Sequence, residues 1–470
     1  MSLRESPYAS PFLAGLDTVL RGLLFPTYWL VSQLLALQQT TAEKQARQGK
    51  PCPPYALQAL LKGTAIVPLL LLSLPLALVA FLAWLPLQAA RRPFAYQRTG
   101  DRALPEEWSL PGQERAFTFI TSNICLLPEG LARFSNLAHT QWRAKHIAQV
   151  LLWAARLSSR RCQRPLRLDI TACFPPSADF VCLQEVFDLR ASTHLRRLLG
   201  SYYGHIIYDV GTYGLVGCSA PKLLNSGLFV ASRYPVLAVQ YRCYPNGTKE
   251  DALAAKGLLC VQVQLGTSHG QRIVGYLNCT HLHAPEADAE IRCDQLNLGL
   301  LWAQLFQDAN AQPGDVVAFD IYCGDLNFDN CSAGDEMEQG HQIFNLYTDP
   351  CRLGPRKDKP WAIGGSPPRM APAALACPVI LFLCRTLEQP EGRQKYLAGP
   401  VLADGKPDLS LTSCEGRRLD YILYREHPGP LALNTVSWVA GWRLPACLPV
   451  WLQGRTRCFG RVSRTGHACS

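Results

Sequence analysis

The chain has 470 residues, of which 48% are hydrophobic and 17% charged, and its 46 Lys and Arg outnumber its 36 Asp and Glu to give a net charge of +10. Such a length holds one large domain with an accessory region or two to three smaller domains, and the positive charge suits a partner that carries phosphate, either a nucleic acid or an anionic membrane face. The 19 cysteines include no Cys-x-x-Cys spacing and many lie inside apolar runs, which argues against a secreted disulfide scaffold and favours a reducing compartment.

Two long apolar segments open the chain, at about residues 12–42 and 63–90. Each contains an uncharged stretch long enough to cross a hydrocarbon core of roughly 30 Å as a helix. Both also contain proline, which removes a helical donor and kinks the axis, so two re-entrant or interfacial segments stay open as an alternative to two spanning helices. We predict a membrane-anchoring region at residues 1–92. Cys52, between the two segments, is either palmitoylated or, as is more common for a loop cysteine, unmodified.

Composition and periodicity divide the rest of the chain. Residues 93–115 lack periodicity and predict a linker, whereas strand-like runs alternate with helical patterns from 116 to 452, as in an α/β catalytic domain. Within that domain, residues 352–411 are rich in proline and glycine, which predicts a loop insertion outside the core. Residues 453–470 predict an irregular basic tail.

Polar side chains lie at the ends of five apolar, strand-like runs in this domain. The runs are residues 117–123, 180–185, 273–281, 316–327 and 419–423. Strand ends that together carry Asn, Glu, His and Asp predict a metal-assisted phosphoester-cleaving site on a sheet edge. One strand that ends in an acid is ordinary, so the prediction depends on the five runs together.

Glu185 and Asn123 are the predicted metal-binding residues. Glu185 emerges at the end of the buried run Phe180-Val-Cys-Leu-Gln, and Mg²⁺ prefers oxygen ligands and commonly needs only one or two protein carboxylates. Asn123, which ends the first run, is predicted as a neighbouring amide ligand or as a partner of the ligand. For Glu185 alone, an ordinary structural role is the simpler interpretation.

Asp325, Asn327 and His281 are predicted to handle water and phosphate. Asp325 and Asn327 are two residues apart, so on extended backbone both side chains leave on the same face, where a carboxylate can orient water and an amide can donate to a phosphate oxygen. An ordinary Asx turn is the alternative. His281 receives the phosphate-facing role, and His283 is predicted at the rim or in packing because Pro285 begins an exit loop.

Asp251 precedes Lys256 by five residues, after the turn Tyr244-Pro-Asn-Gly247. A cation at this point can bind a lipid phosphate, and its spacing from Asp251 allows the two side chains to pair when a loop closes. From spacing alone, a surface salt bridge is the simpler interpretation.

The segment from Phe117 to about Leu452 resembles the DNase I-like, or endonuclease/exonuclease/phosphatase, superfamily. The matching motifs are Leu183-Gln184-Glu185, Thr280-His281-Leu282, Gly324-Asp325-Leu326-Asn327 and Arg418-Leu419-Asp420-Tyr421. Four further motifs, together with the two N-terminal apolar segments, are similar to the membrane-anchored neutral sphingomyelinases: Asn225-Ser-Gly-Leu-Phe229, Ser232-Arg-Tyr-Pro235, Asp251-Ala-Leu-Ala-Ala-Lys256 and His281-Leu-His-Ala-Pro285. The short connection before the catalytic domain is similar to the mitochondria-associated member of that family.

This resemblance implies a two-sheet α/β sandwich of DNase I-like type, preceded by two N-terminal hydrophobic membrane segments. It implies hydrolysis of sphingomyelin to ceramide and phosphocholine with Mg²⁺ or Mn²⁺, activation by anionic phospholipids, no nucleic-acid partner, and a location at the endoplasmic reticulum or mitochondrial membrane. By the same resemblance Glu185 binds the metal with Asn123 beside it, Asp325 and Asn327 handle water and phosphate, and His281 supports the phosphate.

Asp251 and Lys256 match the family's Asp-x-x-x-x-Lys element, which the resemblance assigns to the substrate phosphate. The family ends with an Asp-His pair, whose histidine is the general base and is oriented by the Asp of the Leu-Asp-Tyr motif, here Asp420. This sequence departs from that pattern, because no Asp follows Asp420 and the best local match, Pro445-Ala-Cys-Leu-Pro-Val450, has alanine and cysteine at the pair. His467 lies twenty residues beyond that cysteine, in the predicted tail.

The leading functional hypothesis is a membrane-bound, Mg²⁺-dependent sphingomyelin phosphodiesterase whose activity is reduced in this chain, because loss of a general base typically costs about 10² to 10⁴ in rate. A catalytically impaired lipid-binding membrane protein of the same fold is the alternative from another class. A nuclease of the superfamily is a third, since the metal chemistry hardly distinguishes phosphodiesters, although the N-terminal apolar segments argue against it.

Overall fold

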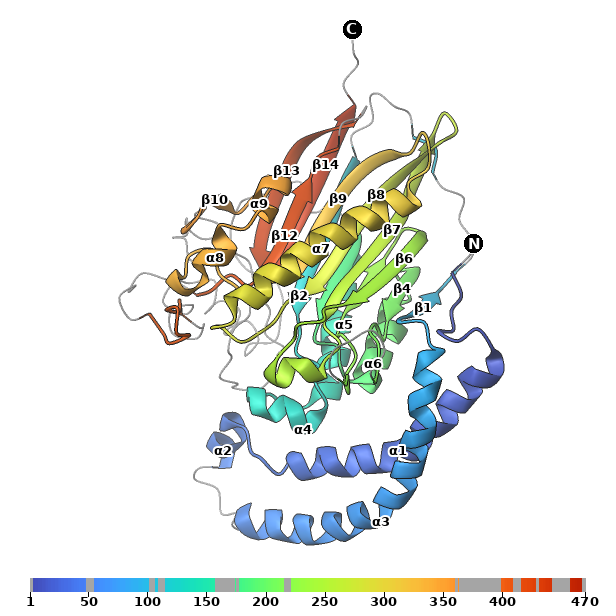
Figure 1. The fold of residues 1–470 in the computed structure, drawn as a ribbon, viewed down its shortest axis with the longest axis vertical. Helices are drawn as coiled ribbons and strands as arrows, with labels where there is room; N and C mark the ends of the chain where they lie inside the picture. Colours follow the sequence, from blue (N-terminus) through green and yellow to red (C-terminus); the bar gives the residue numbers. More distant parts are fainter. Residues whose placement is uncertain are drawn as a thin grey trace.

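The protein is represented by a computed structural model, in which two β-sheets face each other and helices cover their outer faces (Figure 1). The structure describes residues 3–47, 55–100, 106–108, 115–156, 174, 177–214, 221–359, 362, 399–408, 416–427, 431–441 and 457–466. Cys52 and most of the predicted insertion therefore lie outside the described residues.

Three helices form the N-terminal region: α1 (Pro11–Leu35), α2 (Thr41–Arg47) and α3 (Tyr55–Ala89). Among the described residues, α3 is the one helix that is long and apolar enough to cross a membrane, judged by length and composition. Its interior contains three prolines, and the helix curves along its length, as the ribbon shows (Figure 1). Leu71 and Leu72 of α3 are 61% and 77% exposed, which suits contact with lipid rather than with water.

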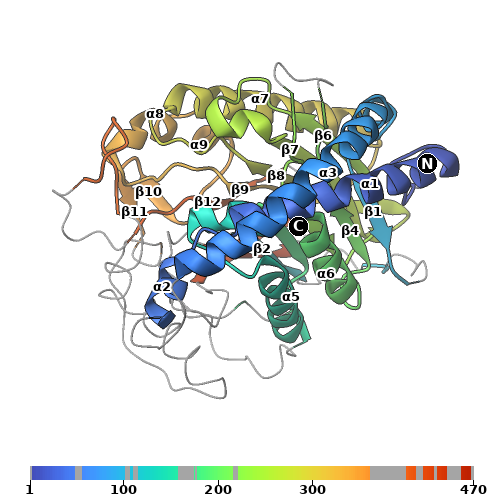
Figure 2. The same ribbon diagram turned by 90° about the horizontal axis from the view of Figure 1, so that it is seen from below.

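Both predicted hydrophobic segments form long helices, and α3 is the one candidate span among the described residues. The segment predicted at 12–42 forms α1, which carries Asp17 and Arg21 in an ion pair of 2.8 Å. Arg21 also lies 3.6 Å from Asp209 of the main domain. These charges hold α1 against the sandwich, and Figure 2 shows α1 and α3 passing across one end of it.

The larger sheet has seven strands in the order β1-β4-β5-β3-β2-β14-β13. Their bounds are β1 Ala95–Arg98, β2 Arg115–Asn123, β3 Phe180–Gln184, β4 His205–Tyr208, β5 Phe229–Ser232, β13 Leu431–Gly441 and β14 Arg457–Gly466. β2 and β3 are parallel, with Asn123 beside Gln184, and every other neighbouring pair is antiparallel. Helix α5 (Thr140–Arg156) lies between β2 and β3 in the chain, as a parallel connection requires.

The second sheet has five strands in the order β12-β9-β8-β7-β6. Their bounds are β6 Val236–Cys243, β7 Gly257–Ser268, β8 Gln271–His281, β9 Val316–Asp325 and β12 Asp420–Arg425. β8 and β9 are parallel and are joined through helix α7 (Ala289–Asn310), with His281 beside Asp325 in the register. Each sheet thus has one parallel pair whose C-terminal ends carry predicted site residues.

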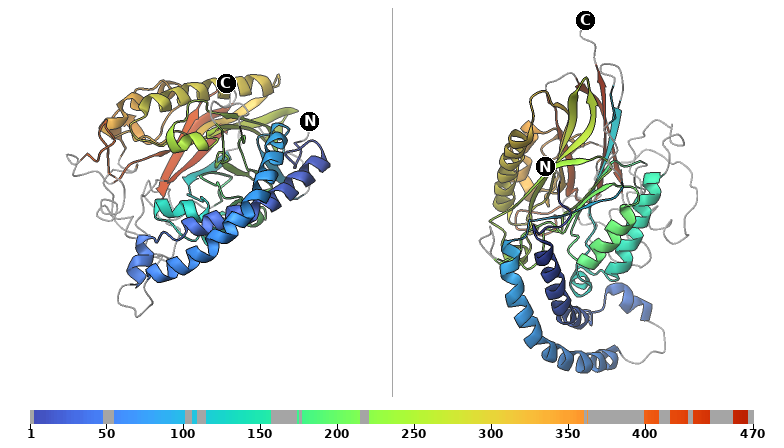
Figure 3. Two further views of the ribbon diagram at one scale, coloured as in Figure 1. Left: turned by 60° about the horizontal axis from the view of Figure 1, so that its bottom comes forward. Right: turned by 90° about the vertical axis from the view of Figure 1, so that its right-hand side faces the viewer.

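Aromatic side chains join the two sheets. Phe119 and Phe180 of the larger sheet stack with ring centroids 5.0 Å apart, and Phe319 of the smaller sheet meets Phe119 edge-on at 4.9 Å. Helices α5 and α6 (Leu189–Leu199) cover the larger sheet and α7 covers the smaller one (Figure 3). This arrangement confirms the predicted two-sheet α/β sandwich.

Short elements complete the fold and lie mostly in its connections. They are α4 Glu129–Ala132, η1 Arg133–Ser135, η3 Lys249–Leu253, η4 Ala333–Asp335, α8 Glu336–Gln339, α9 Ile343–Leu346, β10 Arg352–Gly354 and β11 Lys357–Asp358.

Three regions predicted to be irregular contain strands. β1 lies in the predicted linker and pairs with β4, because the buried residues Phe94 and Tyr96 pack on the sandwich core. β14 lies in the predicted tail and pairs through its backbone with β2 and β13. A polar sequence without alternation can therefore form a central strand when neighbouring strands supply the hydrogen bonds. β10 and β11 pair at the start of the predicted insertion, where Arg418 bonds Asp358 at 2.7 Å.

Asp329 is buried, and Arg418 links it to Asp358 of the β10–β11 hairpin. Its carboxylate accepts hydrogen bonds from the Arg418 backbone N–H at 3.1 Å and from the Ser332 hydroxyl at 2.8 Å. Burial raises the pKa of Asp329 to about 6. The folded state therefore binds this proton more tightly than the unfolded state, and the resulting stabilisation is present below pH about 4 and is lost as the pH rises through about 6.

We expect Asp329→Asn to raise the thermal unfolding midpoint near pH 7.5 by the equivalent of about 2 kcal/mol, and to change it little near pH 4.5, because Asn cannot ionise and keeps an acceptor for the Arg418 N–H. Differential scanning calorimetry of the two proteins at both pH values measures the effect. Asp294→Asn on the exposed face of α7 is the control. Equal midpoint changes at the two pH values would contradict this expectation.

Candidate active site

The predicted site residues meet at one end of the sandwich. Asn123 ends β2, Glu185 follows β3, His281 ends β8 and Asp325 ends β9. Asp420 begins β12 and pairs directly with Asp325 in the antiparallel register. Because β2 and β3 are parallel, as are β8 and β9, their C-terminal ends come to the same edge, as the sequence predicted.

Asn123 holds two carboxylates with one nitrogen. Its Nδ2 donates to Oε1 of Glu185 at 2.6 Å and to Oδ2 of Asp325 at 2.8 Å. Its Oδ1 accepts from the Cys125 backbone N–H at 3.1 Å, which fixes the orientation of the amide. Of the two roles predicted for Asn123, this geometry matches that of a partner that positions the carboxylates.

The backbone at Glu185 is held in an uncommon conformation. Glu185 has φ of 59°, in the left-handed region, and the neighbouring Gly227 has φ of 71°. A Cβ at Gly227 would lie 2.9 Å from the Cα of Glu185, so only glycine allows the two segments to approach this closely. The Val186 N–H donates to the Gly227 carbonyl at 2.8 Å and secures the contact. Strain that the surrounding structure maintains in this way is typical of functional positions.

His281 and Asp420 are both buried beside Asp325. His281 is 1% exposed and its Nε2 lies 3.8 Å from Oδ2 of Asp325. Asp420 is fully buried. Asp325 also accepts the Asn327 backbone N–H at 3.0 Å through its other oxygen, and Asn327 has φ of 54°. The Asx turn that was an alternative for these two residues therefore forms, at the same point where the site residues converge.

Lys256 links Asp251 to the Leu282 carbonyl, which also binds Asn327. Its Nζ donates to Oδ2 of Asp251 at 2.8 Å and to the Leu282 carbonyl at 2.9 Å. The same carbonyl accepts from Nδ2 of Asn327 at 2.8 Å. The Lys256 and Asp251 side chains are 7% and 12% exposed, so the simpler interpretation as a surface salt bridge is wrong.

The Asp251 carboxylate also receives two groups from the loop after β8. The Ala284 N–H donates to its Oδ2 at 2.6 Å, and Nδ1 of His283 lies 3.3 Å away. Burial raises the pKa of Asp251, but the Lys256 ammonium and the hydrogen bonds from His283 and Lys256 outweigh it and hold that pKa far below its ordinary value. Asp251 is therefore ionised throughout the physiological range.

Of the two positions predicted for His283, at the rim or in packing, the structure matches packing. The residue is fully buried and bridges two acids, with Nε2 at 2.8 Å from Oδ2 of Asp288 in addition to its contact with Asp251. The loop that begins at Pro285 is exposed at Glu286 and Ala287 and leads to helix α7.

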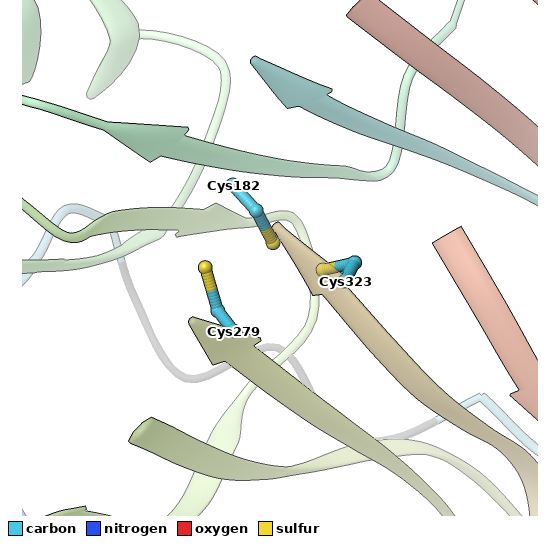
Figure 4. Close-up of side chains that lie close together, drawn as sticks. All are labelled: Cys182, Cys279 and Cys323. Carbon is cyan, nitrogen blue, oxygen red and sulfur yellow. The ribbon is translucent and has the colours of Figure 1, made fainter. Parts of the chain in front are cut away.

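Three thiols lie close together in the core, on strands whose ends carry site residues (Figure 4). The Sγ atoms of Cys182 in β3, Cys279 in β8 and Cys323 in β9 all lie within 4.8 Å of one another. Cys279 and Cys323 stand two residues before His281 and Asp325, so their side chains share the same strand face as these residues. All three are free and buried, as predicted, and the aromatic and aliphatic cluster around them gives them a packing role.

The site end of the sandwich faces the N-terminal helices. The Tyr28 hydroxyl of α1 donates to Asp188 at 2.8 Å, three residues after Glu185. The Gly130 N–H of α4 donates to the Ser32 hydroxyl of α1 at 3.1 Å. The membrane region is thus in direct contact with α4 and with the segment that follows Glu185.

Some features of the site could not be predicted from the sequence. Other predicted positions lie outside the described residues. The Leu282 carbonyl and the backbone of Gly227 are main-chain features, although the Asn225-Ser-Gly turn signalled the second. The Asn225 Oδ1 accepts the Gly227 N–H at 2.9 Å. Pro445–Val450, where the family has its Asp-His pair, and His467 are outside the described residues.

Comparison with known proteins identifies the family. Residues 12–90 match the neutral sphingomyelinase N-terminal transmembrane region, and residues 136–441 match the endonuclease/exonuclease/phosphatase family. Sphingomyelin phosphodiesterase 5 of Mus musculus is 45% identical over 91% of this chain and 88% of the relative. The chain belongs to the neutral sphingomyelinase family.

Two further relatives are similar to this chain over most of its length. Sphingomyelin phosphodiesterase 5 of Danio rerio is 39% identical over 91% of this chain and 93% of its own length. Sphingomyelin phosphodiesterase 3 of Homo sapiens is 33% identical over 91% and 94%. The predicted family is confirmed, and the N-terminal match together with α3 indicates that this neutral sphingomyelinase associates with a membrane. The roles of individual residues stay predictions.

Proposed function

We propose that this protein hydrolyses sphingomyelin at a membrane surface to ceramide and phosphocholine. The observation that carries the proposal is the single Asn123 nitrogen that holds Glu185 and Asp325 together at the end of the sandwich facing α1. In the reaction, a water oxygen bonds to phosphorus, the bond from phosphorus to the ceramide oxygen breaks, and the ceramide oxygen takes up a proton.

The donor set suits a hard divalent cation, Mg²⁺ or alternatively Mn²⁺. Two carboxylates that share one amide donor repel each other when both are ionised, and a cation bound by Glu185 relieves that repulsion. When bound, such an ion neutralises charge on the phosphoryl oxygens. Asn123 then keeps the Glu185 carboxylate oriented, and the strained Glu185 backbone limits its movement.

The remaining residues of the chain orient water and hold the phosphate. Asp325 is the proposed residue that orients the attacking water, with its other oxygen fixed by the Asn327 N–H. His281, Asn327 and Lys256 supply donors for the phosphoryl oxygens, and the Leu282 carbonyl aligns the last two with each other. Asp251 keeps Lys256 in position through its ion pair.

Membrane context supports a lipid rather than a nucleic acid as the substrate. Helix α1 contacts the site end of the sandwich through Tyr28 and Ser32, and α3 exposes its leucines beside it. The net charge of +10 suits anionic phospholipids as activators. The endoplasmic reticulum or mitochondrial membrane, with the catalytic domain in a reducing compartment, is the proposed location.

The absence of an Asp after Asp420 favours a second candidate function, that of a lipid-binding membrane protein with the same fold and little catalysis. The test is release of labelled phosphocholine from headgroup-labelled sphingomyelin in anionic liposomes with Mg²⁺. Metal-dependent release supports the phosphodiesterase, whereas liposome binding without release supports the second candidate. Faster cleavage of plasmid DNA than of lipid would instead reverse the choice in favour of a nuclease.

Lys256→Met should lower kcat/KM for sphingomyelin by about ten- to a hundredfold, because it removes a buried cation from the phosphate and leaves Asp251 without its ion-pair partner. Lys249→Met is the matched control, since Lys249 is 55% exposed and pairs with Asp288 at 3.0 Å. The rates are measured in the same liposomes. A similar loss in both variants would remove Lys256 from the proposed site.

A further inference from the structure

A cavity of about 250 Å³ lies between the N-terminal helices and the loop that follows Glu185. Its walls include Leu24, Phe25 and Tyr28 of α1, Trp84 of α3, and the segments 187–190 and 223–225. The membrane region and the catalytic domain therefore share one pocket, at the end of the sandwich that Figure 2 shows beneath α1 and α3.

The pocket adjoins the proposed metal site. Phe187 lines it and stands two residues after Glu185, so their Cα atoms are at most about 7 Å apart. Asn225 lines it from the other side and leads to Gly227, whose backbone contacts Glu185. The pocket is therefore lined by residues next to both segments that hold the Glu185 backbone in place.

The polar groups of the pocket are largely engaged by the protein itself. Arg21 pairs with Asp17 at 2.8 Å, and the Tyr28 hydroxyl donates to Asp188 at 2.8 Å. The Arg190 guanidinium lies over the Phe25 ring, 5.4 Å from its centroid. The surface left for a ligand is that of the Leu, Phe and Trp side chains, which favours a hydrocarbon over a polar molecule.

We propose that this pocket binds the hydrocarbon part of the lipid substrate adjacent to its phosphate. The inference rests on the proposed function, and it explains why α1 and α3 are packed against the catalytic domain: the apolar helices complete a binding site that the sandwich alone lacks. Substrate selection for a two-chain lipid then depends on residues of both regions.

Leu223→Asp tests the proposal, because Leu223 lines the pocket and is 56% exposed, so a charge at this position affects the pocket more than the fold. Leu301→Asp on α7 is the matched control, with 54% exposure and no part in the pocket. We expect Leu223→Asp to raise KM for sphingomyelin about tenfold, as for loss of contact with a few buried methylene groups. Hydrolysis of a water-soluble chromogenic phosphocholine ester should not change. Equal losses on both substrates, or none on either, overturn the inference.

A binding measurement separates this inference from the proposed chemistry. Sphingomyelin brominated on its acyl chain should quench Trp84 in the full chain, with the Trp84 share identified by comparison with Trp84→Phe. Leu223→Asp should weaken that quenching and Leu301→Asp should not. Leu223→Trp provides a variant that keeps the wall apolar but fills the cavity, and it should exclude long chains more than short ones. Quenching that Leu223→Asp leaves unchanged overturns the pocket, whereas quenching without phosphocholine release overturns the proposed hydrolysis alone.

Discussion

A chain that carries Ala446→Asp together with Cys447→His should hydrolyse sphingomyelin about 10² to 10⁴ times faster than the unchanged chain, because the pair would supply the general base that the family resemblance implies. The register supports this expectation. β13 ends at Gly441 and β14 begins at Arg457 next to it, and β14 pairs Cys458 with Thr121 near the end of β2 where Asn123 lies. Positions 446 and 447 belong to the connection between these two strand ends.

Two further variants identify the cause of such a gain. Ala446→Asn with Cys447→Gln has similar side-chain volumes but no base, so it should leave the rate unchanged. Asp420→Asn in the chain with the substituted pair should remove most of the gain, since Asp420 is the proposed residue that orients the histidine. Release of labelled phosphocholine from anionic liposomes measures all four proteins. No gain from the substituted pair would count against the proposal that this chain lacks a general base.

The sequence predicted the strands of the site well because their signals are local. The runs at 117–123, 180–185 and 273–281 correspond to β2, β3 and β8, since apolar residues bounded by polar ones describe buried strands that end at an edge. Asn123, Glu185 and Asp325 were predicted as site residues because each stands at the end of such a run. In the structure two hydrogen bonds join the three residues.

Elements whose position depends on distant partners were not predictable in this way. β14 is central because β2 and β13 supply backbone hydrogen bonds on both sides, and no property of its own sequence announces this. Arg21 of α1 lies beside Asp209, which is far away in the chain, so local sequence could not predict this contact between the helix and the sandwich. β1 belongs to the same class, because only the edge of the sheet at β4 turns this segment into a strand.

In the site, too, local side-chain patterns were predictable, whereas tertiary and main-chain contacts were not. Lys256 and Asp251 have an uninformative spacing, and their burial beside the Leu282 carbonyl is a tertiary feature. The sequence left both the rim and packing open for His283, whereas in the structure two carboxylates, from Asp251 and Asp288, hold it inside. A carbonyl oxygen has no sequence signature, so the link that Leu282 makes could come only from the structure.

Glu185→Gln should lower the rate of sphingomyelin hydrolysis by about 10³-fold or more, because it removes the charge that binds the cation while its nearly equal volume preserves the packing at the end of β3. The Asn123 Nδ2 still finds an acceptor in the amide oxygen of the substituted side chain, so the fold should persist. The chain with Ala446→Asp and Cys447→His is the appropriate background, since its higher rate makes such a loss measurable. Glu290→Gln, at an exposed position of α7, is the matched control.

Metal binding distinguishes the proposed role of Glu185 from a merely structural one. Titration of Mn²⁺ into the protein, followed by electron paramagnetic resonance of the free ion, should show at least about tenfold weaker binding in Glu185→Gln than in Glu290→Gln. Raising the Mg²⁺ concentration should recover part of the lost activity if the carboxylate acts through the cation, because weaker binding is compensated by mass action. Loss of activity with unchanged Mn²⁺ affinity would assign Glu185 to another role. In that case Asp325, held by the same Asn123 nitrogen, becomes the carboxylate to test as the ligand.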